Sequence, residues 1–450
     1  MMRKNFGMRK SHAPVQAISA SQAAGLVKSG MWLDYGAILS QPDVFDKALA
    51  GRIRELRNVK LRNCLSMRPR AVFEADPDGE HIFCFSLHFS GYDRKLHDCG
   101  RCNYIPVNLG EIPDYYRRFM DPADIVILKT RPLDEDGCFN FGGSVLWHRA
   151  IVERAKLVIV ETSRALPHAY GEQAAIHVDE VDYVIKGDDA PLPELPNSPA
   201  SVIDRAVASH ITAEIEDGAC LQVGIGGMAN AVCALLADSG VCDLGVHTEM
   251  MTDGMVELYK AGKITGAKKN LNPGKIVYTF ALGSRQLYAA QDRNPDMLCC
   301  PVEYTNAPHI IMQNDRMFSI NNTTQVDLQG QAASESDGHR HISGTGGQSQ
   351  FVRGAYASKG GKSFICLPST FEKGGVRRSR IVLNLTEGNI ATTTRSDVMY
   401  VVTEYGMVNL KGKSVAERAK GLIGIAHPDF REDLDRQAHE HRLIPRCLWL

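Results

Sequence analysis

One stretch, centred on residues 221–251, constrains the fold of this chain more than any other. A short apolar run ends in the glycine cluster Gly224-Ile225-Gly226-Gly227, a small-residue helical segment follows over residues 230–236, and a second apolar run, residues 244–248, ends at Glu249. Glycines can take backbone angles that other residues avoid, so the cluster predicts a sharp turn between a strand and a helix. The whole stretch is typical of a parallel α/β unit, with the turn and Glu249 at the carboxyl edge of the sheet, where open sheets bind ligands.

The turn predicts a site for a negatively charged oxygen. The N–H groups of the glycine turn and of the first helical turn point away from the helix and carry partial positive charge. Gly226 and Gly227 are therefore candidates for stabilising an oxyanion, with Gly224 beside them, and Glu249 is the candidate nucleophilic carboxylate at the same edge.

The same glycines also fit a dinucleotide-binding pattern, Gly224-x-Gly226-x-x-Ala229. That pattern needs an acidic residue at the end of the second strand, where it binds a ribose hydroxyl. Asp243 instead opens the second apolar run and would lie at the opposite edge of the sheet. The misplaced acid disfavours dinucleotide binding.

Composition excludes several classes of partner. The 450 residues carry 51 basic and 52 acidic side chains, a net charge of −1, so no long-range attraction to nucleic acid or to an anionic membrane is expected. No apolar run approaches the roughly 20 residues needed to span a bilayer. Twelve scattered cysteines, several in apolar runs, are typical of reduced thiols in a reducing compartment, so we expect a cytoplasmic protein.

Two local patterns have plainer interpretations. Cys99-Gly100-Arg101-Cys102, after His97, has the spacing of a metal or redox pair, but a zinc site needs four ligands and no second pair matches, so we predict no metal site. The residues before Asp34 are basic and lack acids, as in a transit peptide. Residues 19–24 nevertheless predict a capped structural helix closed by Gly30, so a removable peptide could only be the short basic tip.

Apolar runs alternate with helical segments along the chain, which predicts an α/β fold of two open, largely parallel-sheet domains. Four prolines within residues 188–199 indicate a domain linker. We predict an N-terminal domain at residues 1–190, a linker at 191–200 and a C-terminal domain at 201–450. The expected strands are residues 59–67, 81–89, 103–109, 125–129, 157–161 and 183–185 in the first half, and 219–223, 244–248, 275–280, 317–328, 363–367, 381–385 and 399–403 in the second.

A second glycine-rich loop, Gly344-Thr345-Gly346-Gly347-Gln348, precedes another helical segment. Its backbone could approach a ligand closely and donate N–H groups to it. The loop lacks the lysine of a phosphate-binding P-loop, which disfavours nucleoside triphosphate hydrolysis. It could equally be only a turn.

An amide-rich segment, residues 318–328, contains Asn321 and is followed by Glu335. Buried amides need partners, so these residues either line a polar site or form an internal network. Glu335 is a rival for the catalytic carboxylate. We prefer Glu249 because it directly follows a strand in the unit that supplies the glycine turn, whereas Glu335 lies in a polar loop where solvation is the default.

Five ordered motifs resemble the acetyl-CoA hydrolase/transferase family of class I CoA-transferases. They are residues 223–228, residues 244–249, Asp327-Leu328-x-Gly330-Gln331, Gly344-x-Gly346-Gly347-Gln348 and Val402-Thr403-Glu404-Tyr405-Gly406. In the first half Tyr104-x-Pro106 agrees more loosely, so the resemblance covers nearly the whole chain. Two positions depart from the family pattern, which often has proline where Ala229 stands and aspartate where Gln350 stands.

The resemblance implies ping-pong transfer of CoA between carboxylic acids, with Glu249 as the nucleophile. It also implies that Gly226 and Gly227 supply oxyanion-hole N–H groups, that Asn321 contacts the thioester, and that Gly224, Gly344, Gly346, Gly347 and Gln348 contact CoA. No tightly bound cofactor is expected, because acyl-CoA and a carboxylate are substrates. The resemblance further implies a homodimer or higher homo-oligomer.

Two other functions stay open at this stage. A thioester hydrolase would share the fold, and a nucleotide- or CoA-binding regulatory protein would bind without turnover. Transfer is favoured over hydrolysis because the motif offers no separate base to activate water. His247 is the nearest candidate, and it shares a strand face with Glu249 only if that strand stays regular.

Overall fold

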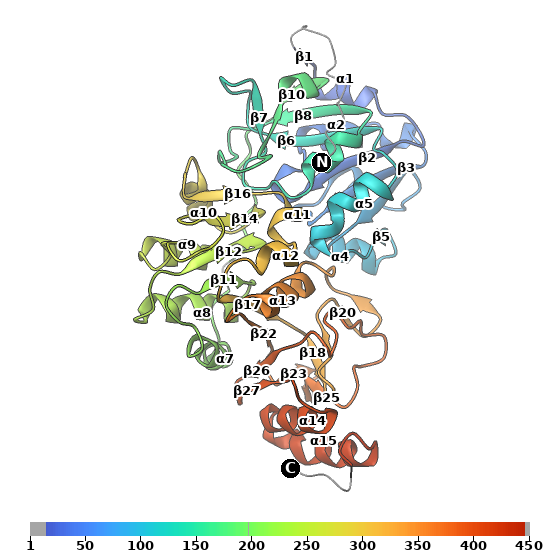
Figure 1. Ribbon diagram of the computed structural model, residues 1–450. Helices are drawn as coiled ribbons and strands as arrows, with labels where there is room; N and C mark the ends of the chain where they lie inside the picture. Colours follow the sequence, from blue (N-terminus) through green and yellow to red (C-terminus); the bar gives the residue numbers. More distant parts are fainter. Residues whose placement is uncertain (1–14, 197, 446–450) are drawn as a thin grey trace. The chain divides into compact units, whose positions relative to one another are not determined.

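The computed structural model describes residues 15–196 and 198–445, and the chain divides into two compact units (Figure 1). The first unit contains the chain up to Val107 with Glu111–Glu194 and Thr279–Glu303, and the second contains Asn108–Gly110, Leu195–Tyr278 and the chain from Tyr304. The chain passes from the first unit to the second at Leu195, within the linker expected at 191–200. Residues 108–110 also belong to the second unit and residues 279–303 to the first, so the chain passes between the units at these points as well. Most of the basic N-terminal tip, which includes Arg3 and Arg9, lies outside the described residues.

An eight-stranded sheet forms the centre of the first unit, in the order β1-β10-β8-β6-β2-β3-β4-β5. All seven neighbouring pairs are parallel, as the alternation of strands and helices predicts. The strands are β1 (Gln16–Ala17), β2 (Trp32–Ala37), β3 (Val59–Cys64), β4 (Ile82–Ser86), β5 (Cys102–Tyr104), β6 (Ile125–Thr130), β8 (Leu157–Thr162) and β10 (Tyr183–Lys186).

The central strand β2 was not among the expected strands. Its run is interrupted by Asp34 and Gly36, residues that are depleted in strands. Both are required by the surroundings: Asp34 is fully buried and accepts hydrogen bonds from the Tyr116 hydroxyl at 2.6 Å and from Gly36 N–H at 2.8 Å. A side chain at Gly36 would begin 2.7 Å from Leu128 Cδ2. Close packing therefore explains a strand that local preference disfavours.

Helices cover this sheet. α1 begins with the predicted capping box of Ser19 and Gln22, but it ends at Gly25 rather than reaching Gly30, because Leu26 already takes the cap position. A smaller pair, β7 (Cys138–Asn140) and β9 (Ala175–His177), is antiparallel, and β15 (Phe280–Ala281) and β16 (Met297–Cys299) also belong to this unit. The helices are α1 (Ala20–Gly25), α2 (Val44–Ala50), α3 (Ala71–Glu74), α4 (Gly91–Asp98), α5 (Ile112–Arg118), α6 (His148–Arg154) and α10 (Arg285–Gln291).

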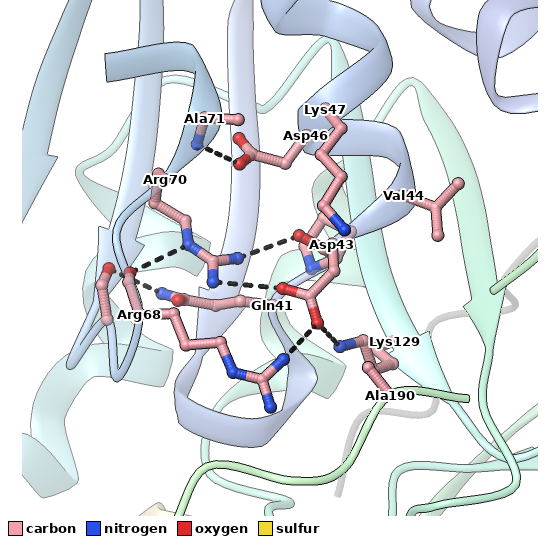
Figure 2. A network of polar contacts seen from close by, with 12 residues as sticks. Gln41, Asp43, Val44, Asp46, Lys47, Arg68, Arg70, Ala71, Lys129 and Ala190 are labelled. Atoms are coloured by element: carbon pink, nitrogen blue, oxygen red, sulfur yellow. Dashed lines mark hydrogen bonds and ion pairs between the residues drawn. The ribbon is translucent and has the colours of Figure 1, made fainter. Parts of the chain in front are cut away.

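A buried ion cluster ties α2 to the sheet (Figure 2). Asp43, which directly precedes α2, accepts hydrogen bonds from Lys129 Nζ of β6 at 2.5 Å, from Arg68 Nη1 at 2.9 Å and from Arg70 Nη2 at 3.1 Å. Burial alone would raise the pKa of Asp43, but the three cations outweigh it and lower the pKa. Removing Asp43 would leave largely buried cations without their anion, so the cluster contributes to holding the fold together.

The second unit has a mostly parallel sheet in the order β14-β12-β11-β17-β22-β26-β27, with only the last pair antiparallel. This arrangement confirms the predicted α/β class. The expected strand at residues 317–328 breaks at Thr323 and Thr324, and its second piece joins a separate small sheet. The main strands are β11 (Cys220–Val223), β12 (Gly245–His247), β14 (Ile276–Tyr278), β17 (Met317–Asn322), β22 (Lys362–Cys366), β26 (Tyr400–Thr403) and β27 (Gly406–Asn409).

Short strands and helices complete this unit. The strands are β13 (Met250–Met251), β18 (Gln325–Asp327), β19 (Ala332–Ala333), β20 (Ser336–Asp337), β21 (Arg340–His341), β23 (Thr370–Lys373), β24 (Val376–Ser379) and β25 (Ile381–Val382). The helices are α7 (Val202–Thr212), α8 (Gly227–Asp238), α9 (Asp253–Lys260), α12 (Pro308–Ile311), α13 (Gln348–Ala357), α14 (Val415–Ile425) and α15 (Pro428–Glu440), and α11 (Val302–Thr305) lies at a change of unit. α14 and α15 lie side by side near the C-terminus (Figure 1) and pack through Leu422 and Leu434 into one apolar cluster with Val401. Their apolar spacing serves packing. Across the described residues, no helix is long and apolar enough to cross a membrane.

Candidate active site

Glu249 lies just beyond the carboxyl end of β12, where the sequence places it. The strand ends at His247, and Thr248 N–H still bonds to Val277 O at 2.9 Å. The Thr248 hydroxyl then bonds to Met250 O at 3.1 Å and stabilises the turn that carries Glu249. The side chain is therefore fixed by a regular strand on one side and a closed turn on the other.

Two groups hold the Glu249 carboxylate, and both come from distant parts of the second unit. Asn306 Nδ2 donates to Oε2 at 2.6 Å, and the backbone N–H of Gly347 donates as well. The Thr305 hydroxyl donates to Asn306 Oδ1 at 3.1 Å, which orients the amide. Gly347 directly precedes α13, so the carboxylate lies at the positive end of a ten-residue helix.

The surroundings of Glu249 shift its protonation. Part of the residue surface remains exposed, but protein atoms surround the carboxyl group closely. This burial raises the pKa of Glu249 to about 7, although the hydrogen bonds from Asn306 and Gly347 act to lower it. Near neutral pH the group is divided between its two protonation states, and its ionised form is more basic than an ordinary carboxylate.

A side chain at position 347 would displace groups of the site. A Cβ atom built there would lie 2.1 Å from Glu249 Oε2 and 2.3 Å from Asn306 Nδ2. Its φ of −100° is open to any residue. The sequence predicted Gly347 as a CoA contact, and the structure adds a direct contact with the candidate nucleophile.

The first glycine turn lies at the same edge of the sheet as Glu249, because β11 and β12 are parallel neighbours. Gly226 has φ +102°, and Asn322 Nδ2 donates to Ile225 O at 2.9 Å, which pins the turn. α8 starts at Gly227, and its N-cap residue, Gly226, has no side chain that could cap it. The turn thus offers N–H groups at this edge, and the oxyanion role of Gly226 and Gly227 stays a prediction.

Asn321 and Asn306 have different partners. Asn321 Nδ2 donates to Gln222 Oε1 at 3.0 Å and to Ser319 Oγ at 2.8 Å, within a network on β11 and β17. Asn306 is the asparagine that contacts Glu249. The predicted contact of Asn321 with a thioester stays a prediction. Asn306 was missed, because nothing in its local sequence marks a residue that meets Glu249 57 positions away.

The remaining predicted CoA-binding residues also have internal contacts. Gly346 has φ +64°, and its carbonyl accepts from Leu109 N–H at 2.9 Å. Gln348 Nε2 donates to Thr393 Oγ1 at 3.0 Å. Gly224 N–H bonds to Ile320 O at 3.0 Å. CoA contacts at these residues and at Gly344 stay predictions.

Gln350, one of the two departures from the family pattern, is buried in α13. Its Oε1 accepts from Gly110 N–H at 2.9 Å, and a Cβ at Gly110 would lie 2.8 Å from Asn306 Cβ. Gln350 therefore braces a short backbone segment next to Asn306. Ala229, the other departure, lies in the first turn of α8 and is 3% exposed.

His247 cannot act as an accessible base. It is fully buried, and its Nε2 lies 2.8 Å from Thr305 O. Burial and the charge of Lys269 lower the pKa of His247 to about 3, so the ring is neutral at physiological pH. The residue packs in the core while Glu249, two positions later, lies beyond the strand.

Glu335 departs from the expectation of a solvated loop, because it is only 5% exposed. Burial raises its pKa, against the hydrogen bond from the Thr345 hydroxyl and the charge of His341. The tertiary packing of the loop 333–345 explains the difference. Glu335 is therefore a second buried carboxylate in the same unit.

The other acidic motif residues stabilise local structure. Asp327 accepts from the backbone N–H groups of Gln329 at 3.0 Å and Gln331 at 2.9 Å, which closes a turn. Glu404 accepts from Ser369 N–H at 2.8 Å and from Ser369 Oγ at 2.5 Å. Both carboxylates are thus engaged within the protein.

The alternatives for metal and dinucleotide binding gain no support. Cys99 is exposed, whereas Cys102 is buried with its Sγ 3.3 Å from Cys84 Sγ. Within residues 15–196 and 198–445, no group of three or more His, Cys, Asp or Glu side chains is placed to hold a metal ion. Asp243 precedes β12 and accepts from Thr265 Oγ1 at 2.9 Å, at the edge opposite Glu249.

Comparison with known proteins defines the family. The acetyl-CoA hydrolase/transferase N-terminal domain matches residues 3–196, and the C-terminal domain of the same name matches residues 283–438. The butyryl-CoA:acetate CoA-transferase of Anaerostipes caccae is 44% identical over 95% of this chain and 97% of its own length. The 4-hydroxybutyrate coenzyme A transferase of Clostridium kluyveri is 44% identical over 78% of this chain and 80% of its own length. The crystal structure of RipA from Yersinia pestis is 36% identical, with a TM-score of 0.87 over 95% of this chain and 98% of that one.

The chain therefore belongs to the acetyl-CoA hydrolase/transferase family, as its motifs predicted. With these relatives it is an enzyme of the CoA-transferase class. Proteins named acetyl-CoA hydrolase also match, at 27% and 28% identity.

Proposed function

We propose that this enzyme moves CoA from a short-chain acyl-CoA to a carboxylate such as acetate, through a covalent thioester on Glu249. The observation that carries the proposal is the geometry of Glu249: a carboxylate at the carboxyl edge of the sheet, held by Asn306 Nδ2 at 2.6 Å and by Gly347 N–H, with a pKa of about 7. The substrate class follows the names of the relatives, which include transferases for butyryl-CoA with acetate and for 4-hydroxybutyrate.

The chemistry balances with these groups alone. A Glu249 oxygen attacks the thioester carbonyl, a C–O bond forms, the C–S bond breaks, and an acyl-glutamyl anhydride and CoA thiolate result. The thiolate then attacks the glutamyl carbonyl, which releases the first carboxylate and leaves a glutamyl-CoA thioester. The acceptor carboxylate attacks this thioester, and the returning thiolate attacks the acceptor carbonyl to give the new acyl-CoA and free Glu249.

Backbone donors are proposed to lower the barrier of these steps. Negative charge develops on the carbonyl oxygen at each attack, and fixed N–H groups stabilise it without reorganising. The turn at Gly226 and Gly227 and the start of α8 supply such groups at the edge where Glu249 lies. The loop 344–348 is proposed to contact CoA at the same edge.

Transfer is proposed over hydrolysis for a chemical reason. Hydrolysis of the glutamyl thioester needs a base that activates water, and the nearest histidine, His247, is fully buried with a pKa near 3. The relatives named as hydrolases are also more distant than those named as transferases.

A mass measurement tests the covalent step. Incubation with butyryl-CoA without acceptor should add CoA less one water to the intact protein, and the adduct should map to Glu249. Glu249→Gln removes the anionic nucleophile with little change in shape and should abolish adduct and exchange. The matched control is Glu257→Gln, an exposed glutamate on α9, which should behave as wild type. An adduct on another residue would overturn the assignment.

A rate comparison separates transfer from hydrolysis. Exchange of labelled acetate into acyl-CoA should exceed thiol release at saturating acetate. Release that equals or exceeds exchange would make the enzyme a hydrolase, and binding without either would indicate a regulatory protein.

Assembly and location form the last part of the proposal. We expect a homodimer, since closed twofold assemblies are the commonest kind, and light scattering that finds a monomer across micromolar concentrations would contradict it. We also expect a cytoplasmic protein, because every cysteine within the described residues is a free thiol. CoA is expected to bind as a substrate and not as a resident cofactor.

A further inference from the structure

The second buried carboxylate of this unit, Glu335, is attached to the segment that leads into the Gly344–Gly347 loop. Its backbone carbonyl accepts from Ile342 N–H at 2.9 Å, and its side chain accepts a hydrogen bond from the Thr345 hydroxyl. Thr345 is two residues before Gly347, whose N–H holds Glu249. Glu335 therefore contacts the loop on the side where the chain enters it.

The residue before Glu335 also bonds to the segment that holds the first turn of α13. The Thr392 hydroxyl accepts from the backbone N–H of Ser334 at 3.0 Å, and the Thr392 carbonyl accepts from Ser349 Oγ at 2.5 Å. The next residue, Thr393, accepts from Gln348 Nε2 at 3.0 Å. The adjacent residues Ser334 and Glu335 thus contact both the loop before α13 and the segment 392–393 that holds its first turn.

We propose that Glu335 is a positioning residue for Glu249: by bonding to Thr345 it fixes the entry to α13 and so sets the Gly347 N–H against the Glu249 carboxylate. This inference rests on the proposed role of Glu249 as the nucleophile. Gly347 lies against both groups of the site, since a Cβ built there would lie 2.1 Å from Glu249 Oε2 and 2.3 Å from Asn306 Nδ2. A displacement of about 1 Å in such a contact can cost about a hundredfold in rate.

The charges around Glu335 agree with an acceptor role. Glu335 is 5% exposed, the charge of His341 acts on it, and the Thr345 hydroxyl donates to it. An acceptor with a hydroxyl donor can be replaced by the carbonyl of a glutamine, whereas an alanine leaves the Thr345 hydroxyl without its acceptor. A nucleophile could not be replaced in that way, so the two roles make opposite predictions for glutamine.

Four variants test the proposal: Glu335→Ala, Glu335→Gln, Thr345→Val and, as a matched control, Asp337→Ala, an exposed acid in the same segment. The protonation of Glu249 is read out without turnover, by labelling with a diazo compound at a series of pH values. The protonated carboxyl gives its proton to the diazo carbon, N₂ leaves, and the ester that forms is mapped to Glu249 by mass spectrometry. Exchange kinetics give kcat and KM for each variant.

Glu335→Ala and Thr345→Val should each lower kcat about ten- to a hundredfold with little change in KM. Each should also move the labelling midpoint of Glu249 upward by about one pH unit, because the Gly347 N–H, a donor to the charged form, is displaced. Glu335→Gln should recover most of kcat and the wild-type midpoint, and Asp337→Ala should match wild type. The double variant Glu335→Ala/Thr345→Val should be no worse than either single variant, because both remove one interaction.

Three outcomes would overturn the proposal. The first is a wild-type kcat and Glu249 midpoint in Glu335→Ala. The second is a Glu335→Gln variant as inactive as Glu335→Ala with an unchanged midpoint, which would make Glu335 itself reactive. The third applies if Glu335→Ala does not fold: it is a Thr345→Val variant in which the labelling midpoint of Glu249 equals that of wild type. A wild-type enzyme that forms no CoA adduct would refute the proposed function, and the labelling midpoints would still decide whether Glu335 positions Glu249.

Discussion

The second unit contains two glycine-rich segments that are similar in sequence. They differ in the property of glycine that each one uses. The Gly224–Gly227 turn leads into α8, and the Gly344–Gly347 loop leads into α13. At Gly226 the backbone angle φ is +102°, while the nearest atom to an added Cβ would be 3.8 Å away. At Gly347 φ is −100°, while an added Cβ would lie 2.1 Å from Glu249.

The difference separates conformation from space as reasons for glycine. Gly226 needs a backbone conformation that side chains rarely adopt, and it has room around it. Gly347 has an ordinary conformation and no room. A glycine pattern therefore predicts a special loop, but only the tertiary structure shows which property is used, and substitutions at the two positions should fail for different reasons.

The largest expected effect comes from filling the space at Gly347. Gly347→Ala should push apart Glu249, Asn306 and the start of α13, and should lower turnover roughly a thousandfold, the upper range for losing one fixed donor. Exchange assays and the CoA adduct on Glu249 measure it. Gly240→Ala is the matched control, since nothing lies within 4 Å of a Cβ there and its φ is not positive.

Near-normal turnover in Gly347→Ala would show that the loop shifts freely. The close contact between Gly347 and Glu249 would then not matter for catalysis, and the distinction between the two glycine-rich loops would not hold.

A smaller but still large effect is expected at Gly226. Gly226→Val must take φ near +102°, which strains a β-branched residue, or move the N–H groups at the start of α8. Turnover should fall by a factor of roughly a hundred to a thousand if these groups stabilise the oxyanion. Circular dichroism and thermal unfolding should show that the fold persists, and a variant with near-normal turnover would remove this role from the turn.

The parts of the site that could be predicted from sequence are those set by local pattern. Alternating apolar runs predict the parallel sheets, and the run that ends at Glu249 places it at the carboxyl edge, because strand direction follows from the α/β alternation. Gly226 is recognisable as a turn residue for the same local reason. The family motifs add the reaction class.

The parts that could not be predicted depend on long-range contacts. Asn306 meets Glu249 57 residues away, and no spacing rule connects them. β2 could not be predicted, because its buried Asp34 receives a hydrogen bond from Tyr116, which lies 82 residues further along the chain. Glu335 lies in a sequence that is polar by composition and becomes buried only when residues 345 and 392 pack around it.

The third prediction concerns pH and distinguishes the two asparagines. Glu249 reacts as the carboxylate, so adduct formation should rise with pH and level off above its pKa of about 7. Asn306→Ala removes a hydrogen bond that favours the charged form, so the midpoint should move upward by about one unit, and the loss of rate should be greatest below pH 7. Stopped-flow or quenched-flow measurement of adduct formation across pH gives both midpoints.

Asn321→Ala is the comparison, because Asn321 bonds to Gln222 and Ser319 and not to Glu249. Its midpoint should stay at the wild-type value, whatever its effect on acyl-CoA binding. A shift in Asn321→Ala with none in Asn306→Ala would exchange the roles assigned to the two residues.

The smallest effect is expected at Ala229, in the first turn of α8. The helix makes its first internal bond from Asn230 N–H to Gly226 O at 3.0 Å, so the N–H of Ala229 is not part of the helical ladder. Proline is tolerated in the first turn of a helix. It restricts the unfolded chain, which stabilises the folded protein by up to about 1 kcal/mol. Against this, its extra atoms must fit a site that is 3% exposed. Ala229→Pro should therefore change the free energy of unfolding by less than about 1 kcal/mol in either direction and leave turnover nearly unchanged. Denaturant unfolding and exchange assays on the same preparation measure the two quantities. A stable Ala229→Pro variant that loses turnover about a hundredfold would show that the N–H at position 229 is itself an oxyanion donor, and would move the centre of the site from Gly226 and Gly227 into the helix.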